Sequence, residues 1–225
     1  MSRTSPACPA PDGMEAGAIA KAEGLDGQGA PAPLLSARGV TLQYRTPQHI
    51  VTATWRVDFD VLPSDRFILL GPSGCGKSSL LKAVGGFLPP VEGTLTINGR
   101  PIARPGPDRM MVFQEFEQLL PWRTVLGNVL FPMRATGRFR GREAVERAED
   151  VIARVGLARF TDVYPHMLSG GMKMRVAIAR AMAMEPDILL MDEPFAALDA
   201  LTRRKMQEEL LGLWHQLRFT MLFVT

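Results

Sequence analysis

The stretch FILLGPSGCGKSS, residues 67–79, decides the fold of this 225-residue chain. Four apolar residues run directly into a glycine-rich segment, and KSSLLKAVGGF (77–87) follows with the composition of a helix that ends at its glycine pair. Residues 71–78 fit the pattern G-x-x-x-x-G-K-[S/T] at every position. Glycines let successive backbone N–H groups turn toward an anion, so the stretch predicts a strand, a phosphate-binding loop and a helix.

The phosphate loop contains the side chains that a bound nucleotide needs. Lys77 would supply a cation to the β- and γ-phosphates, the Ser78 hydroxyl would bind Mg²⁺, and Ser79 would reach the α-phosphate. The alternative, a glycine turn without a ligand, is disfavoured by the strand and the helix on either side. The remaining residues of the predicted ATP-binding loop are Gly71, Pro72, Ser73, Gly74, Cys75 and Gly76.

A second segment, ILLMDEP (188–194), places two carboxylates at the end of an apolar strand. Ligands of open α/β sheets collect at the carboxyl ends of the strands. We predict that Asp192 holds Mg²⁺ and that Glu193 orients or deprotonates the attacking water. Because neighbouring residues of a strand point to opposite faces, one acid is expected to serve the metal and the other the nucleophile.

The composition is that of an ordinary globular protein, with 46% apolar and 22% charged residues and a net charge of +3. This charge neither demands nor excludes a nucleic-acid partner. The longest apolar runs are too short to span a bilayer, and the N-terminus lacks the pattern of a signal peptide, so we expect a cytoplasmic protein. Residues 1–33, rich in Ala, Pro and Gly, predict a disordered tail.

The remaining periodicity predicts strands on both sides of a helical insertion. Residues 34–45 and 49–61 alternate as two antiparallel strands, and an Asn-Gly turn follows the strand in GTLTINGRPI (93–102). Residues from about 115 to 184 change to a helical period, with the clearest apolar stripe at Val145, Ala148, Val151, Ile152 and Val155. Further predicted elements are a strand in MMVFQ (110–114), a helix at about 201–217 and a strand at 220–225.

A second glycine motif opens LSGGMKMRVAIARAMAMEP, residues 168–186. Ser169, Gly170 and Gly171 precede an Ala- and Met-rich segment with spaced Arg and Lys, which predicts a helix that begins at the glycines. Free N–H groups and the helix dipole favour an anion at such an N-terminus. The chain therefore has a second predicted phosphate site about a hundred residues after the first.

Together these motifs resemble an ABC-type ATPase domain. The phosphate loop, Gln114 in VFQE, LSGGM, ILLMDEP and ALD (197–199) have the order and spacing of that family, and the resemblance extends from about Leu34 to Thr225. It implies an α/β P-loop NTPase fold with a mainly parallel core sheet, an antiparallel β subdomain and a helical subdomain at about 115–184. It also implies a head-to-tail homodimer, in which the LSGG residues contact the γ-phosphate of ATP bound to the other copy.

The resemblance assigns three further residues. Gln114 would contact Mg²⁺ and the attacking water and signal to a membrane permease, Asp199 would lie at the dimer interface, and Tyr44 would stack on adenine. For Tyr44 the alternative is an aromatic packed in the core. Met174 departs from the family, which often has Gln there. A switch histidine would follow Thr225, so we expect a truncated chain that binds ATP but hydrolyses it at or near background.

The region Gln114–Asn128 is where the family binds its permease, and QLLPWRTVLGNV (118–129) resembles importers of nitrate, aliphatic sulfonates and taurine. The resemblance implies a subunit peripheral on the inner face of the cell membrane, which serves a permease and, indirectly, a solute-binding protein. For RATGRFRGR (134–142), a solvated loop is favoured over contact with anionic headgroups or the permease.

The competing function is an ABC ATPase that acts on nucleic acid in repair or translation. Such proteins usually carry long coiled-coil, zinc-binding or second-ATPase insertions, which this sequence lacks, so no nucleic-acid partner is expected. A GTPase is disfavoured because the sequence has no N-K-x-D motif. A non-enzymatic regulator is disfavoured by the presence of Lys77 and Glu193.

Overall fold

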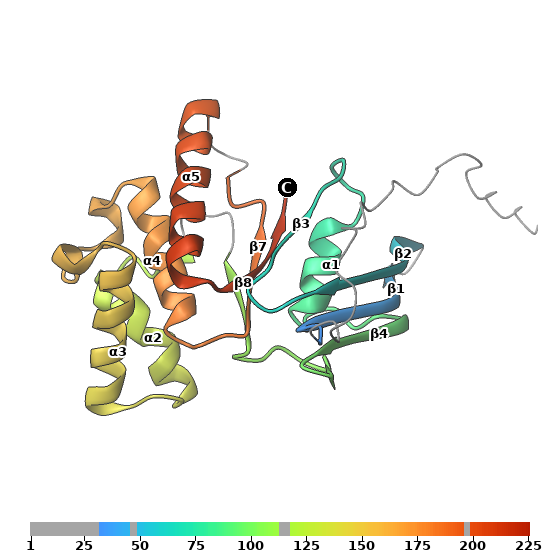
Figure 1. Ribbon diagram of the computed structural model, residues 1–225, viewed down its shortest axis with the longest axis horizontal. Coiled ribbons are helices and arrows are strands. Elements are labelled where there is room, and N and C mark those ends of the chain that lie inside the picture. The colour runs from blue at the N-terminus through green and yellow to red at the C-terminus, as the bar shows by residue number, and fades with distance from the viewer. Residues whose placement is uncertain (1–31, 46–48, 113–117, 196–198) are drawn as a thin grey trace, which may run out of the picture. The chain divides into compact units, whose positions relative to one another are not determined.

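A computed structural model describes residues 32–45, 49–112, 118–195 and 199–225. The tail predicted at residues 1–33 lies outside the described residues, apart from its last two positions. Ala32–Thr225 forms one compact unit of two four-stranded sheets and five α-helices in this described part (Figure 1). The α/β fold class predicted from the sequence is confirmed.

The antiparallel sheet has the order β2-β1-β4-β5. Its strand β1 (Leu35–Arg45) pairs antiparallel with β2 (Ile50–Val61), as the alternating sequence predicts, and also antiparallel with β4 (Glu92–Ile97). The short β5 (Arg100–Pro101) follows β4 through Asn98 and Gly99, whose φ angles are +48° and +71°. The left-handed conformation of both residues explains the tight Asn-Gly turn.

The parallel sheet has the order β3-β8-β7-β6, formed by β3 (Arg66–Leu69), β8 (Thr220–Val224), β7 (Ile188–Asp192) and β6 (Arg109–Val112). All three pairings are parallel, and β8 lies between β3 and β7. Strands β7 and β8 are buried on both faces, which explains their continuous apolar sequences. In Figure 1 the helix α1 (Lys77–Val84) lies between the two sheets and contacts both.

Strand β3 occupies an edge of the parallel sheet among the described strands. Three of its four residues are apolar, yet Ile68 is 52% exposed. Leu70, the residue directly after the strand, is 75% exposed. Apolar composition thus indicates a strand here but not its burial, since burial depends on what packs against each face.

Three helices pack against the face of the parallel sheet opposite α1 and form a second part of the core there. They are α2 (Val125–Thr136), α3 (Gly141–Arg154) and α4 (Gly170–Met182). The apolar stripe predicted for α3 faces this core, with Val145 partly buried and the others buried. Met174 on α4 is also buried there, so it packs as an apolar residue where the family often has Gln. Two short 3₁₀ helices, Ala158–Phe160 and Pro165–Met167, connect α3 to α4.

Helix α5 (Ala200–Leu217) precedes β8 and packs Met206, Leu210 and Trp214 into the same core. Within the described ranges, no helix combines the length and the hydropathy that crossing a membrane requires.

Asn128 on α2 is completely buried and organises the loop before its own helix. Its amide nitrogen donates to the carbonyls of Leu120, Arg123 and Thr124 at 3.0–3.1 Å, and its amide oxygen accepts from the Leu120 N–H at 2.8 Å. This side chain therefore holds the 120–124 loop and does not face a partner. The loop exposes Trp122, which is 70% accessible.

We expect Asn128→Asp to destabilise the protein by about 2 kcal/mol or more, because the amide's hydrogen bonds to the Leu120, Arg123 and Thr124 carbonyls are lost and a carboxylate is buried facing their oxygens. Thermal unfolding measures the effect. Gln216→Glu, the same amide-to-acid change at an exposed position of α5, is the matched control and should change stability by less than about 0.5 kcal/mol. Equal melting temperatures for the two variants would contradict the role of Asn128.

Candidate functional site

The phosphate loop occupies the turn between β3 and α1, and two of its glycines have a left-handed backbone. Gly76, the residue before α1, has a φ of +95°, and a Cβ there would lie 2.0 Å from the carbonyl oxygen of Ala53 on β2. Gly74 is also left-handed, with a φ of +82°. The Lys77 ammonium donates to the carbonyls of Gly71 at 2.8 Å and Pro72 at 3.0 Å, so it lies across the loop.

The two acids predicted at the end of β7 both lie at this loop. The Ser78 hydroxyl donates to Asp192 Oδ1 at 2.9 Å, and the Lys77 Nζ lies 3.9 Å from Glu193 Oε1. The acids thus contact different residues of the loop, and the division of roles between metal and nucleophile stays a prediction. Glu193 follows the last residue of β7 and has a φ of +42°, so its side chain turns toward the loop together with that of Asp192.

A cavity of about 310 Å³ lies beside Lys77 and Glu193. Two residues of α5 that the sequence did not single out, Arg203 and Gln207, form part of its wall. No local pattern could have indicated them, since polar residues on a helix usually face solvent. The described residues that line it are Gly71, Ser73, Lys77, Glu193, Phe195, Arg203, Gln207, Phe223 and Thr225.

Tyr44 near the end of β1 faces the phosphate loop. Its hydroxyl lies 3.1 Å from the Ser79 Oγ, and the residue is 39% exposed. The alternative that Tyr44 packs in the core is therefore wrong. The Tyr44 hydroxyl thus lies at the first turn of α1, and stacking of its ring on adenine stays a prediction.

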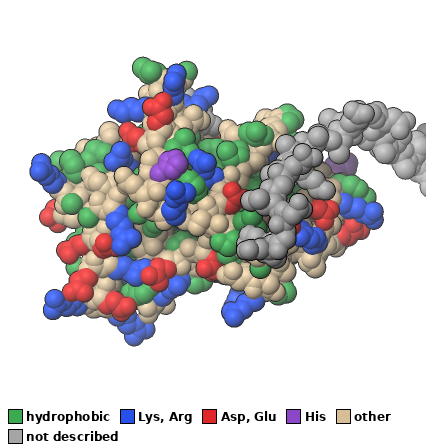
Figure 2. Space-filling view, viewed as in Figure 1, with side chains coloured by type: hydrophobic (Ala, Val, Ile, Leu, Met, Phe, Trp, Pro, Cys, Tyr) green, Lys and Arg blue, Asp and Glu red, His purple; other side chains and the backbone are tan. Residues whose placement is uncertain are grey.

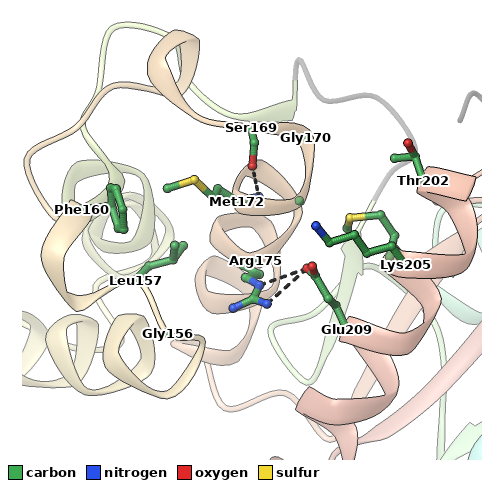
Figure 3. Close-up of a pocket in the computed structure, with 12 residues that line it drawn as sticks. Gly156, Leu157, Phe160, Ser169, Gly170, Met172, Arg175, Thr202, Lys205 and Glu209 are labelled. Atoms are coloured by element: carbon green, nitrogen blue, oxygen red, sulfur yellow. Dashed lines mark hydrogen bonds and ion pairs between the residues drawn. The ribbon is translucent and has the colours of Figure 1, made fainter.

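The LSGG motif forms a second cavity, of about 380 Å³, between the N-terminus of α4 and one face of α5 (Figure 3). Ser169 caps α4 by accepting the Met172 N–H at 3.3 Å. Figure 3 shows Lys205 and Glu209 extending from α5 toward α4. Among the described residues, the two cavities share no lining residue, so each chain carries two separate candidate sites.

Arg175 joins the second cavity to both neighbouring helices. Its guanidinium pairs with Glu209 at 3.2 Å and donates to the Val155 carbonyl, at the end of α3, at 3.1 Å. Gly156 has a φ of +76°, and a Cβ there would lie 3.2 Å from the guanidinium. This ion pair thus links the LSGG helix to α5.

Asp199 caps α5, a local role that the family resemblance did not indicate. Its carboxylate accepts the N–H groups of Leu201 at 3.1 Å and Thr202 at 3.0 Å. The hydrogen bond from the Thr202 backbone is the largest cause that lowers the pKa of Asp199 below its usual value. Gln114 and the first two residues of ALD lie outside the described residues.

These structural features by themselves define a class of protein. A parallel strand, a glycine loop and a helix present a lysine and a serine to two acids at the carboxyl end of another strand of the same parallel sheet. This arrangement is that of a P-loop nucleotide-binding domain.

The family model described as ABC transporter matches residues 55–196. The chain is 49% identical over 175 residues to the taurine import ATP-binding protein TauB of Rhizobium johnstonii, covering 78% of this chain and 66% of that protein. It is 44% identical over 193 residues to the bicarbonate transport ATP-binding protein CmpD of Synechocystis sp., covering 85% and 68%. The chain thus spans about two thirds of the length of these curated relatives. It belongs to the ABC transporter family.

Solved structures agree with this assignment. The cbiO1 protein of Clostridium perfringens, part of the ABC transporter complex cbiONQ, matches with a TM-score of 0.74 at 26% identity, covering 86% of this chain and 78% of that one. A dimeric post-hydrolysis state of the ATP-binding cassette MJ0796, bound to ADP and Pi, matches with a TM-score of 0.66 at 32% identity, covering 85% and 87%.

Proposed function

We propose that this protein binds ATP with Mg²⁺ and hydrolyses it to drive the import of a small anion through a membrane permease. The observation that carries the proposal is the convergence of Lys77 and Ser78 with Asp192 and Glu193 beside one cavity. The names of the relatives support it, because TauB is a taurine import ATP-binding protein and CmpD a bicarbonate transport ATP-binding protein.

The donor set at the loop fits a magnesium ion. Ser78 and Asp192 bring a hydroxyl and a carboxylate oxygen to 2.9 Å from each other, and Mg²⁺ prefers such oxygen ligands together with substrate phosphates. When bound, the ion would neutralise charge on the β- and γ-phosphates. Gln114 is proposed as a further ligand on the family resemblance alone.

Lys77 and Glu193 have different roles in the proposed hydrolysis. Lys77 now binds two loop carbonyls, and phosphate oxygens would take their place as acceptors. Glu193 lines the same cavity and would accept a proton from the attacking water. Backbone N–H groups of Gly71–Ser79 would surround the β-phosphate.

Replacing Glu193 by Gln should leave ATP binding intact and reduce turnover by a factor of about 10² or more, as expected for the loss of a general base. The measurement is steady-state ATPase activity together with ATP affinity, on protein prepared from its complete reading frame. Glu208→Gln, which removes only an exposed acid paired with Arg204, is the control and should keep the original rate. Wild-type turnover in the Glu193 variant would refute the assigned role.

Tyr44 is proposed to stack on the adenine base, since its hydroxyl contacts Ser79 of the loop and the residue is exposed. Tyr44→Ala should weaken ATP binding by about fivefold or more, the effect of losing one aromatic–base stack. Tyr44→Phe should bind within about twofold of the original, because the ring remains. Equilibrium titration with ATP measures both variants.

The chain offers a matched control in its second tyrosine, Tyr164, which is similarly exposed and stacks on His166 far from the loop in sequence. Tyr164→Ala should bind ATP normally. An equal loss in Tyr44→Phe and Tyr44→Ala would assign the effect to the hydroxyl and its bond to Ser79 instead of the ring.

We further propose that two copies pair head to tail, with the Ser169 cavity of one copy facing the ATP of the other. Support comes from the separation of the two cavities within one chain and from the dimeric MJ0796 structures. Each ATP would then be enclosed only when both copies are present, which makes dimerisation depend on ATP. Asp199 caps the helix between the cavities and is proposed to lie at this interface.

Ser169→Asp tests this pairing without disturbing the fold, since Asp is also a good helix N-cap. Its carboxylate would face a γ-phosphate across the interface, so ATP-dependent dimerisation should be lost. Ser169→Asn keeps the cap without the charge and should still dimerise. Substitution of Gly171 is less suitable, because a Cβ there would lie 3.1 Å from the Met206 Sδ.

Analytical ultracentrifugation in a Glu193→Gln background measures the association. A normal ATP-induced dimer of the Ser169→Asp protein would overturn the two-site proposal. Loss of the dimer in both Ser169 variants would show that the hydroxyl itself is needed.

The permease is proposed to bind the region Gln114–Asn128, where Trp122 is exposed on a loop that Asn128 holds. A solute-binding protein would act through the permease, and the subunit would lie at the inner face of the membrane. For the nucleic-acid alternative, a broad basic surface would be expected. On the face shown in Figure 2, acidic and basic side chains are interspersed over the helices, which favours the transport function.

A further inference from the structure

Glu193 has a backbone conformation that needs support from its surroundings. Its φ of +42° lies in the left-handed region, which is unfavourable for a residue with a side chain. Such strain persists at functional sites only where the surrounding structure holds the residue in place. The contacts on either side of Glu193 therefore decide where its carboxylate points.

The N-terminal side of Glu193 is held by the sheet. The Glu193 N–H donates to the Val224 carbonyl of β8 at 3.0 Å, which continues the pairing of β7 with β8. On the C-terminal side, the ring of Phe195 is buried and lies 5.9 Å from the ring of Phe223. A ring contact alone fixes the side chain better than the backbone, since the peptide planes can still rotate.

Arg203 supplies the backbone contact on that side. Its Nε donates to the Phe195 carbonyl at 3.2 Å, two residues after Glu193. The guanidinium comes from the first turn of α5, which is itself fixed by the Asp199 cap and by the bond from the Arg203 N–H to the Asp199 carbonyl at 2.8 Å. Arg203 also lines the cavity of Lys77 and Glu193.

We infer that Arg203 is a positioning residue for ATP hydrolysis. By binding the Phe195 carbonyl, it holds the strained segment after β7 so that the Glu193 carboxylate faces the phosphate loop. The inference rests on the proposed function and adds a residue of α5 to the hydrolysis site. Without this bond, Glu193 can relax toward a right-handed conformation that moves its carboxylate away from the attacking water.

The neighbouring residue provides a matched control. Arg204 has the same side chain and lies on the same turn of α5, but it is 81% exposed and pairs with Glu208 one turn along the helix. It lines neither of the two cavities described above. Comparing Arg204→Ala with Arg203→Ala therefore separates the effect of losing an arginine from this turn from the effect of losing the bond to the Phe195 carbonyl.

The experiment compares Arg203→Ala, Arg203→Lys and Arg204→Ala in protein prepared from its complete reading frame. Arg203→Ala should lower kcat by about 10- to 100-fold, the range expected when a reacting group is misplaced by about an ångström. Its ATP affinity should stay within about twofold, and its melting temperature should match that of Arg204→Ala. Arg203→Lys, which keeps one donor, should recover part of the rate.

A second comparison tests whether Arg203 acts through Glu193. In a Glu193→Gln background, adding Arg203→Ala should cause no further loss of single-turnover rate, because the residue that Arg203 positions is already absent. A further tenfold loss there would overturn the inference, and so would a tenfold weaker ATP affinity of Arg203→Ala, which indicates direct contact with phosphate.

Failure of the inference and failure of the proposed function give different results. If the unaltered protein hydrolyses ATP in a Lys77-dependent manner and Arg203→Ala matches Arg204→Ala, only the role of Arg203 is wrong. If the unaltered protein shows no Lys77-dependent hydrolysis, the proposed function fails and the inference fails with it.

Discussion

Strand β8 pairs with β3 on one side and with β7 on the other, and every candidate catalytic contact depends on this parallel alignment. Parallel strands end at the same edge of a sheet, so the loop after β3 and the acids after β7 meet although more than a hundred residues separate them. The 2.9 Å hydrogen bond between Ser78 and Asp192 is the direct result. A change of register between these strands would separate the phosphate loop from its acids.

The two faces of the parallel sheet serve different cores. On β7, Ile188 and Leu190 pack toward α1 and the antiparallel sheet, whereas Leu189 and Met191 pack toward the helices. The phosphate loop is therefore supported on one face and the LSGG helix on the other. A single sheet thus carries both candidate sites without bringing them together in one chain, which is why a second copy is part of the proposal.

Helix α5 connects these two sites physically. Thr202, Lys205 and Glu209 line the cavity at the LSGG helix, while Arg203 and Gln207 line the cavity at the phosphate loop. Residues three or four positions apart share a helix face, so the two sets lie on adjacent faces of the same rigid element. A displacement of α5 would alter both cavities at once. The Asp199 cap and the Arg175–Glu209 ion pair restrict that displacement.

The sequence by itself determined the fold class, the phosphate loop and the acids at the end of β7. These depend on local patterns: strand alternation, a glycine motif between a strand and a helix, and helical periodicity as in α3. The resemblance to ABC-type ATPases extended the interpretation to the LSGG helix, and the family comparisons agree with it.

Only the tertiary structure decided which of these elements pack together and which way their side chains face. It placed Tyr44 at the loop instead of in the core, left Ile68 of β3 exposed, and buried Asn128 among the carbonyls of a preceding loop. It also turned Glu193 toward Lys77 through a left-handed backbone and placed Arg203 behind it. No local pattern encodes these outcomes, because each results from contacts between segments whose spatial relation the sequence period does not specify.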